Sequence, residues 1–502
     1  MDTATDVIVV GAGPTGLLLA IELALAGAAV VVLERRTAPD DTIKAGAIGA
    51  LAGEALERRG LRDAIATEER LAAEAIARMA GIAGPAAARP PWEKRGGHFA
   101  GLFLIDQPRQ NGPQRRIRGV QQQALECMLG ARAAELGIAV RRGVEVVDVA
   151  EDADGVAVTA QGRDGPLALR GSYLVGCDGG RSPTRKRAGF AFPGTDPTIT
   201  GYQAIVSLDH PERLLPLGWR RTPTGMMAYG PIPGRIFLAR FDGPPGDRDA
   251  AVTREELEHT LRHISGADVR ITAVSTATRF TDHARQADSY RRGRILLAGD
   301  AAHVHSPFGG QGLNLSLLDA ANLGWKLAAV VRGRSPDTLL DSYTAERHPV
   351  AARVLANTRA QVALMRPDAM TGALRDVVAD VMRLDEGNRF FGDMISGLTT
   401  RYDLGEAHPL AGTIAADIPV GDGGSLFALM QDGCGVLVDA SDGTASRLAA
   451  PWRDTLRCVK AADDLSRLVR PDGCIAWCAS DGVTSGLEAA LARWFGAARA
   501  AA

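Results

Sequence analysis

The first 34 positions alternate between apolar stretches and a glycine-rich turn, a pattern that predicts secondary structure. Residues 6–10 (DVIVV) are apolar and predict a buried strand, and an Ala/Leu-rich stretch after them predicts a helix. A second apolar run predicts another strand that ends at Glu34, and Gly11, Gly13 and Gly16 stand between the first strand and the helix. The order of these segments indicates the beginning of a βαβ unit.

The G-x-G-x-x-G spacing of these glycines is typical of a dinucleotide site. Gly11 permits a tight turn, Gly13 lets the backbone approach a pyrophosphate, and Gly16 lets helix and strand pack closely. The helix N-terminus offers free N–H groups to the phosphates, and Glu34 can accept hydrogen bonds from a ribose diol. A purely structural glycine turn is the alternative, and the motif does not separate FAD from NAD.

The next segments read as an excursion followed by a strand meander. Residues 42–80 have a helical pattern, and residues 81–119 are interrupted by Pro and Gly. A helix is predicted over 121–136. Alternating strands follow and end on a buried strand over 173–176.

The middle of the chain changes to a strand-rich pattern and then returns to a glycine-rich loop. Residues 181–276 predict a separate sheet-rich domain with one helix over 254–265. Within it, GMMAYGPIPGRIFLARF (225–241) predicts a β-hairpin. Residues 291–331 predict a buried strand, a glycine-rich loop and a long helix, so this part returns to the chemistry of a nucleotide site.

The last part of the chain predicts helices and then a small α/β unit. The helical pattern continues to about Leu398 and is followed by Pro- and Gly-rich sequence. Strands are predicted over 435–439, 456–460 and 468–477, and a closing helix over 487–495. The chain therefore predicts an α/β protein whose parts are residues 1–180, 181–276, 277–398 and 399–502.

Composition places this chain among globular proteins that act on small molecules. Hydrophobic residues make up 46% of 502 residues, and 57 Lys and Arg nearly balance 59 Asp and Glu. We therefore expect neither nucleic acid nor a membrane surface as a partner. The N-terminal MDTATDV lacks the basic region of a signal peptide, and Glu22 and Gly27 interrupt the long apolar run. A cytoplasmic location is expected.

The cysteines predict neither a metal site nor a disulfide. They are scattered, without C-x-x-C and without a His partner at zinc-ligand spacing: Cys127, Cys177, Cys434, Cys458, Cys474 and Cys478. The last two stand in GCIAWCA, which reads as a strand in which four residues span about 13 Å, beyond disulfide reach. Reduced thiols are expected, as in cytoplasmic proteins.

Three separated motifs occur in a recognisable order: GAGPTG at Gly11 with Glu34, CDGGRS at Cys177, and GDAAHVHSPFGGQGLN at Gly299. Together they resemble the class A FAD-dependent aromatic hydroxylases, the para-hydroxybenzoate hydroxylase fold family. LGWKLAAVV, DSYTAERHPVA, RYDLGEAHPLAG and LVRPDGCIAW resemble the branch of aromatic polyketide hydroxylases and rifampicin-type monooxygenases. The resemblance implies a Rossmann-type FAD-binding domain, an inserted β-sheet-rich substrate domain and a thioredoxin-like C-terminal domain.

The resemblance also implies roles for the third motif. Asp300 is expected to bond a ribityl hydroxyl, and the backbone at Pro307, Gly309 and Gly310 to lie along the flavin. The helix that begins near Gln311 would aim its positive end at the flavin, which suits the negative charge of reduced flavin. The alternative is that the glycines only form a loop and that Asp300 caps the next segment.

Further cofactor-binding positions follow from the same resemblance: Arg35, Lys44, Gln122, Asp178, Gly312, Leu313 and Asn314. Several have simpler explanations. Asp178 also fits an ordinary Asp-Gly-Gly turn after a strand, and Gln122 fits an exposed helix start. Arg35 and Arg36 suggest an NADP phosphate site, but with FAD assigned here a solvated role is simpler. Arg181 fits a phosphate contact and a surface residue equally.

One position departs from the pattern of the family. Lys44 in IKAGAIGALAGEAL retains a basic residue, but Leu51 stands where members of the family that the chain resembles often carry an arginine. Any mechanism that depends on that arginine is therefore in doubt, and the substrate or reaction outcome of this member could differ. His303 and His305 fit either acid–base roles or packing in the loop.

The resemblance implies an FAD-dependent monooxygenase that consumes NADH or NADPH and O2. A flavin C4a-hydroperoxide would transfer oxygen to a polycyclic aromatic, polyketide-type substrate, as in antibiotic biosynthesis. Met227, Tyr229 and Phe237 are the candidate substrate-lining residues, with core packing as the alternative. Two rival functions remain: Baeyer–Villiger insertion or oxidative rearrangement of a polyketide quinone, and a flavoprotein that only sequesters an aromatic ligand. The sequence leaves the oligomeric state open.

Overall fold

A computed structural model of the chain describes residues 4–40, 42–79, 97–230, 232, 234–248, 250–421 and 423–498. Its largest sheet has eight strands, of which the path β14–β15–β6–β1–β2–β3 forms the main row. These strands are β1 (Ala4–Val10), β2 (Val30–Glu34), β3 (Ala139–Arg142), β4 (Glu145–Asp152), β5 (Gly155–Gly162), β6 (Gly165–Gly176), β14 (Arg291–Arg292) and β15 (Ile295–Leu297). The five strands from β15 to β3 are parallel, which is the arrangement of a Rossmann-type sheet. The predicted fold class is confirmed.

The predicted opening βαβ unit is present. Helix α1 (Pro14–Leu25) connects β1 to β2, and the three segments bury almost every apolar side chain. Strands β1, β6 and β15 are neighbours in register, so that Val10, Gly176 and Leu297 lie at the same edge of the sheet. Because each of the three glycine-rich motifs follows one of these strands, the topology brings all three motifs to one edge.

The predicted helical excursion is shorter than expected. It consists of α2 (Ala50–Glu57) and α3 (Arg62–Met79), and residues 42–49 are not helical because Ile48 pairs its backbone with Arg118 instead. Of the stretch predicted to be irregular, residues 81–96 lie outside the described residues, and residues 97–119 contain a short 3-10 helix, η2 (Gln107–Arg109), and isolated bridges. The predicted helix after it is α4 (Gln122–Glu135).

A five-stranded antiparallel sheet occupies the middle of the chain, in the order β12–β8–β11–β10–β9. Its elements are β8 (Thr200–Leu208), β9 (Gly218–Thr222), β10 (Gly225–Tyr229), β11 (Arg235–Arg240) and β12 (Ile271–Phe280), with α6 (Arg254–Ser265) on one face. The predicted hairpin is β10 with β11. Because β12 continues to Phe280, the boundary expected after residue 276 falls inside a strand. The division into domains otherwise stays a prediction.

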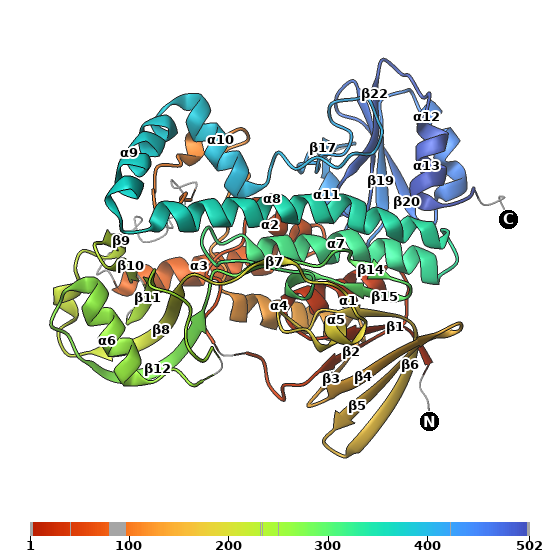
Figure 1. The fold of residues 1–502 in the computed structure, drawn as a ribbon. Coiled ribbons are helices and arrows are strands. Elements are labelled where there is room, and N and C mark those ends of the chain that lie inside the picture. The colour runs from red at the N-terminus through yellow and green to blue at the C-terminus, as the bar shows by residue number, and fades with distance from the viewer. Residues whose placement is uncertain are drawn as a thin grey trace.

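Long helices connect the sheet domains. They are α7 (Gly312–Val331), α8 (Asp341–Met365), α9 (Ala369–Arg383) and α10 (Asp385–Ser396). Figure 1 shows α7 and α8 side by side across the molecule, with the five-stranded sheet near one end and the last unit, in blue, near the other. Short elements complete this part: α5 (Pro183–Arg187), β7 (Gly194–Thr195), β13 (Ala284–Gln286) and β16 (His303–Val304).

The last unit is a four-stranded mixed sheet in the order β20–β19–β21–β22. Its elements are β19 (Gly435–Asp439), α12 (Thr444–Ala449), β20 (Leu456–Lys460), β21 (Leu465–Val469), β22 (Ile475–Ser480) and α13 (Leu487–Phe495), preceded by β17 (Pro419–Val420), β18 (Gly424–Ser425) and α11 (Leu426–Leu429). The prediction of a single strand over 468–477 is wrong. A turn at Arg470–Gly473 splits it into two antiparallel strands, and Gly473 adopts the positive φ that this turn requires.

A buried cluster of charged side chains, here called the junction cluster, joins the last unit to the helices. Its members are Glu22, Arg58, Arg59, Lys326, Glu346, Arg470 and Asp472. Arg59 contacts Glu22 at 2.7 Å, and Glu346 accepts hydrogen bonds from Lys326 at 2.8 Å and from both terminal nitrogens of Arg470. The cluster is almost completely buried, and its acids contact its bases, although Nη1 of Arg58 has no hydrogen-bond partner among the described residues. Its contacts tie the last unit to α1, α7 and α8.

Two expectations about the chain's surroundings can be compared with the described residues. All six cysteines are free thiols. None of the described helices combines the length and apolar character that crossing a membrane requires.

Candidate functional site

The first and second motifs lie in contact at positions where only glycine leaves enough space. Gly11 has φ +107°, and a Cβ added to it would lie 2.4 Å from the carbonyl oxygen of Cys177. A Cβ on Gly16 would lie 1.9 Å from the carbonyl oxygen of Gly11. The third motif reaches the same place, because a Cβ on Gly299 would lie 2.9 Å from Oγ1 of Thr15. These three glycines allow the motifs to touch.

Gly13 differs from its neighbours because the position of its absent Cβ faces open space. Helix α1 begins at Pro14, and Gly13 as its N-cap provides no side-chain acceptor for the first N–H groups. Those groups are free to bind an anion at the positive end of the helix. Glu34 lies against the same turn and accepts hydrogen bonds from the backbone N–H groups of Ala12 and Arg36, each at 2.8 Å.

The loop of the third motif is also open on one side. Gly310 has φ +64° and no atom within 4 Å of its absent Cβ, and Pro307 is exposed. Gly309 has φ +85°, but a Cβ there would lie 2.5 Å from Nε2 of Gln361. Asp300 is exposed, and its side chain makes no hydrogen bond to the described residues. Helix α7 begins at Gly312 directly after this loop.

Asn314 ties the loop to the segment before α2. Its Oδ1 accepts a hydrogen bond from Gly49 N–H at 2.6 Å, and its Nδ2 donates to the carbonyl oxygen of Gly310 at 2.9 Å. Leu313 is half-buried against the core of the large sheet. The geometry therefore brings Gly310, Gly312, Leu313 and Asn314 together around one backbone turn.

The structure brings the remaining predicted residues into the surroundings of this site less directly. The backbone N–H of Gln122 donates to Ala45, but its side chain donates to Glu126 at 3.0 Å on its own helix. Lys44 pairs with Asp40 at 2.7 Å. Arg35 is exposed. Cofactor contacts of these three side chains stay predictions.

Asp178 fits its simpler explanation and the cofactor role at once. One oxygen, Oδ2, accepts the backbone N–H of Thr184 at 3.0 Å, as an Asp in a turn does. The other, Oδ1, is buried without a partner among the described residues. The same is true of four atoms around the third motif: Nδ1 of His303, Nε2 of His305, Oγ of Ser306 and Oγ of Ser316. Buried polar atoms without partners fit a polar ligand such as FAD, whose phosphates and hydroxyls could satisfy them.

The sheet opposite the loop presents an aromatic wall. Phe237 lies 5.5 Å from Phe308 of the third motif, 4.7 Å from Trp219 and 4.9 Å from Phe280, measured between ring centroids. Met226 belongs to the same apolar cluster. This wall, which includes Phe237, packs against Phe308 in the loop of the third motif, and a substrate-lining role for Phe237 stays a prediction.

Two of the predicted substrate-lining residues lie on the other face of the sheet. Met227 and Tyr229 pack with Leu257 and Leu261 of α6. The reason is the alternation of side chains along a strand, since Phe237 is paired across the hairpin with Ala228. Residues 226 and 228 therefore share the face of Phe237, and the prediction for Met227 and Tyr229 is wrong.

Sequence reasoning missed further residues at this site. The aromatic residues Trp219, Phe280 and Phe308 could have been found in two ways. Residues opposite one another on paired strands share a face of the sheet, and the loop of the third motif itself contains a phenylalanine. A chain of amides also went unnoticed: Gln361 accepts the N–H of Ala100 at 3.0 Å and donates to Asn357, which donates to Gln311 at the start of α7. No motif in the sequence signals these contacts.

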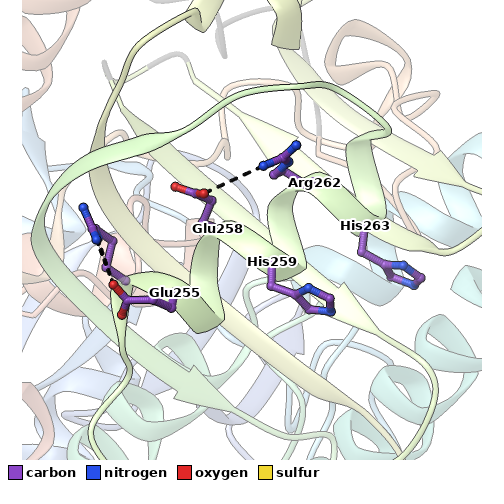
Figure 2. A pocket seen from close by; sticks show the side chains of 6 residues that line it. Glu255, Glu258, His259, Arg262 and His263 are labelled. Atoms are coloured by element: carbon purple, nitrogen blue, oxygen red, sulfur yellow. Dashed lines mark hydrogen bonds and ion pairs between the residues drawn. The ribbon is translucent and has the colours of Figure 1, made fainter.

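A separate cavity of about 410 Å³ lies on the outer side of α6. Figure 2 shows that Glu255, Glu258, His259, Arg262 and His263 line it, all from one helix, with the two histidines side by side. None of these residues belongs to the predicted motifs. Among the described residues, no group of three or more His, Cys, Asp or Glu side chains is arranged to hold a metal.

His98, on the aromatic wall, should make the apoprotein sensitive to acid. Burial lowers the pKa of His98 from about 6.5 to about 4, and its Nδ1 accepts the N–H of Gly101. Below pH 6.5 the unfolded chain binds a proton that the folded chain refuses until about pH 4, so stability falls as pH is lowered through this range. Between pH 7 and pH 4, the unfolding free energy of His98→Asn should fall by roughly 3 kcal/mol less than that of the wild type. Urea denaturation at each pH measures this, and equal losses would contradict it. Replacing the exposed His259 is the control.

The comparisons with known proteins agree with these motifs. A family model described as "FAD binding domain" matches residues 4–358, and one described as "Aromatic-ring hydroxylase, C-terminal" matches residues 408–498. A 12-dehydrotetracycline 5-monooxygenase/anhydrotetracycline 6-monooxygenase from Streptomyces rimosus is 40% identical over 98% of this chain and 99% of the relative. A rifampicin monooxygenase from Streptomyces venezuelae is 38% identical over 99% of both chains.

Solved structures and one relative of a different kind extend the picture. The structure of an anhydrotetracycline hydroxylase from Streptomyces rimosus superposes with a TM-score of 0.86 at 39% identity, over 99% of this chain and 100% of the other. A dialkyldecalin synthase from Streptomyces rugosporus is 37% identical over 98% of this chain and 99% of its own. Relatives of this similarity therefore carry names of two kinds, monooxygenase and synthase.

Proposed function

Because the chain belongs to the family of FAD-dependent aromatic-ring hydroxylases, we propose that it is a monooxygenase that oxygenates a polycyclic aromatic substrate, with NADH or NADPH and O2 as co-substrates. The meeting of the three motifs at one sheet edge, with open space at Gly13 and Gly310, carries this proposal. The polycyclic, polyketide-type substrate is proposed from the names of the relatives.

FAD, when bound, would accept a hydride from NAD(P)H and activate O2 so that one oxygen atom can be transferred. The protein's own groups would hold it. The N–H groups at the start of α1 would bind the pyrophosphate, Glu34 the adenosine ribose, and Asp300 a hydroxyl of the ribityl chain. The backbone around Gly310 and the positive end of α7 would face the isoalloxazine and stabilise its reduced anion.

The aromatic wall would supply the second requirement, a dry site. Phe237, Trp219 and Phe280 present apolar faces toward the loop that carries Phe308. Such faces exclude water from the reacting centre and stack well on fused aromatic rings. Leu51 is buried near Gly397 and adds no polar group. We therefore propose that substrate orientation here depends on apolar contact, since Leu51 takes the place of the arginine that the family resemblance leads us to expect.

One experiment tests the proposed function. The purified protein should be yellow and release FAD on heating, and fused-ring phenols or quinones should stimulate its NAD(P)H oxidation with matching product. Mass and carbon connectivity of the product separate hydroxylation from Baeyer–Villiger insertion or rearrangement. Release of FMN, or no flavin after reconstitution, would contradict the proposal. We place the enzyme in the cytoplasm, where its six thiols would stay reduced.

A second candidate is a synthase that forms a ring without oxygen, which the 37% identical dialkyldecalin synthase favours. In that function FAD would be bound, and the apolar wall would fold a flexible substrate. Ligand turnover without O2 uptake and without NAD(P)H oxidation would establish it. A protein that only sequesters an aromatic compound would show neither turnover nor O2 uptake.

Replacing Asp300 by Ala should weaken FAD binding. The exposed carboxylate has no partner of its own among the described residues, so the change removes a ligand contact and disturbs little else. A hydrogen bond to a charged group contributes about 1.5 to 3 kcal/mol, which corresponds to roughly a ten-fold or larger rise in the Kd. Fluorescence titration of the apoprotein measures this. Asp288→Ala, an exposed aspartate before β14, is the control, and an unchanged Kd for Asp300→Ala would show that Asp300 does not bind FAD.

A further inference from the structure

One buried carboxylate holds both ends of the segment that carries Asp300. Oδ2 of Asp319, on α7, accepts the backbone N–H of Gly299 at 3.2 Å and contacts Nε2 of His303 at 2.6 Å. Asp319 and the His303 side chain are 0% exposed. One side-chain oxygen of Asp319 therefore holds the segment 299–303 at both its first and its last residue.

Between these two anchors, Asp300 has no fixed contact of its own. It lies in a short 3-10 helix, η4 (Gly299–Ala301), closed by a hydrogen bond from Ala302 N–H to Gly299. Gly299 has φ +63°, so the chain turns sharply just before Asp300. Because the Asp300 side chain is exposed and unbonded, its position depends on where the two anchors hold the backbone.

Asp319 is itself held rigidly. Its Oδ1 accepts a hydrogen bond from Nε of Arg347 at 2.7 Å, and Arg347 also donates to the carbonyl oxygen of Leu315 and to the hydroxyl of Tyr402, each at 3.1 Å. Burial raises the pKa of the Asp319 carboxyl, but Arg347 and His303 outweigh it and hold the pKa below its ordinary value. The carboxylate is therefore ionised. Its short contacts with Arg347 and His303 are of the strong, charge-assisted kind, and the 3.2 Å bond from Gly299 is longer.

We propose that Asp319 is a positioning residue for the flavin: it sets the place of Asp300 by clamping Gly299 and His303, and so determines how well Asp300 binds the cofactor. This rests on the proposed function only in that FAD is the ligand. Asp319 would not touch the flavin, since its side chain is completely buried and its oxygens contact Gly299, His303 and Arg347.

A double-mutant cycle on FAD affinity tests the proposal. Asp319→Asn keeps the volume but removes the charge, and we expect it to raise the Kd for FAD roughly ten-fold, about 1.4 kcal/mol. In an Asp300→Ala background the same change should raise the Kd less than about two-fold, because the contact that Asp319 positions is already gone. The visible absorption band of bound flavin should shift in Asp319→Asn, and fluorescence titration gives all four Kd values.

Asp439→Asn is the matched control, a buried carboxylate in the last unit that accepts hydrogen bonds from Ser441 and Ser446. It should leave the Kd and the flavin spectrum unchanged, even if thermal stability falls. If Asp319→Asn does not fold, His303→Asn releases one anchor and enters the same cycle with Asp300→Ala. Additive effects on the Kd would overturn the proposal, as would an unchanged Kd in Asp319→Asn. Failure of the proposed function would instead show as wild-type protein that binds no FAD or does not oxidise NAD(P)H.

Discussion

Replacing Gly310 by Val should abolish coupled product formation while the protein keeps its fold. The absent Cβ of Gly310 faces open space, with no protein atom within 4 Å, so the new side chain would project to where we place the isoalloxazine. A displaced flavin would lose its alignment with α7 and with the substrate, and a shift of about 1 Å can lower the rate roughly 100-fold. NAD(P)H oxidation would be slow and would end in hydrogen peroxide. Product formed per NAD(P)H consumed is the measurement.

Gly333 offers a closely matched control for this variant. It has the same φ of +64° and also no atom within 4 Å of its absent Cβ, but it lies at the far end of α7. Gly333→Val should carry the same backbone strain, about 1 to 2 kcal/mol, without any effect on coupling. Wild-type coupling in Gly310→Val would show that the flavin does not lie beside this loop.

Replacing Glu346 by Ala should destabilise the protein by about 3 to 5 kcal/mol. Glu346 accepts hydrogen bonds from Arg470, Lys326 and Asn322 inside the junction cluster, where the side chains are almost completely buried. Without this carboxylate, the buried cations of Lys326 and Arg470 lose the negative charge that they share. Leaving a buried charge without its partner costs free energy. Chemical denaturation monitored by fluorescence measures the loss.

Arg353→Ala on the same helix is the control for Glu346→Ala. Arg353 is exposed, so its removal should change the unfolding free energy by no more than about 0.5 kcal/mol. If Glu346→Ala were no less stable than Arg353→Ala, the junction cluster would contribute nothing to the attachment of the last unit.

The parts of the fold that depend on local pattern could be predicted from the sequence. The strand–turn–helix–strand opening, α6 and α13 follow from apolar periodicity and turn residues, which act over a few positions. The strand predicted over 468–477 failed because the apolar run was given more weight than Pro471-Asp472-Gly473, which is a turn sequence. The signal was present and was underweighted.

The candidate site was predictable where backbone geometry defines it and not where side chains meet across the fold. Gly11, Gly16 and Gly310 are required by conformation or by close approach, and such positions can be read from a motif. The contacts of Asp319 and Gln361 join segments that are distant in the chain, and nothing local announces them. Met227 was misplaced because the pairing of the two hairpin strands decides the face, and the strand pattern alone does not.

The junction cluster also bears on how such proteins recombine. Its charges come from α1, the residues directly after α2, α7, α8 and the turn between β21 and β22. Arg58 donates a hydrogen bond to the backbone carbonyl of Asp472 across 414 positions of the chain. A chimera that takes its last hundred residues from a relative loses this chain's Arg470 and Asp472 but keeps Arg58, Asn322 and Glu346, which contact them. Crossovers near residue 400 should therefore yield folded offspring only between parents that share the whole charge set. The C-terminal unit can therefore be exchanged between relatives only together with the residues of the junction cluster that it contacts.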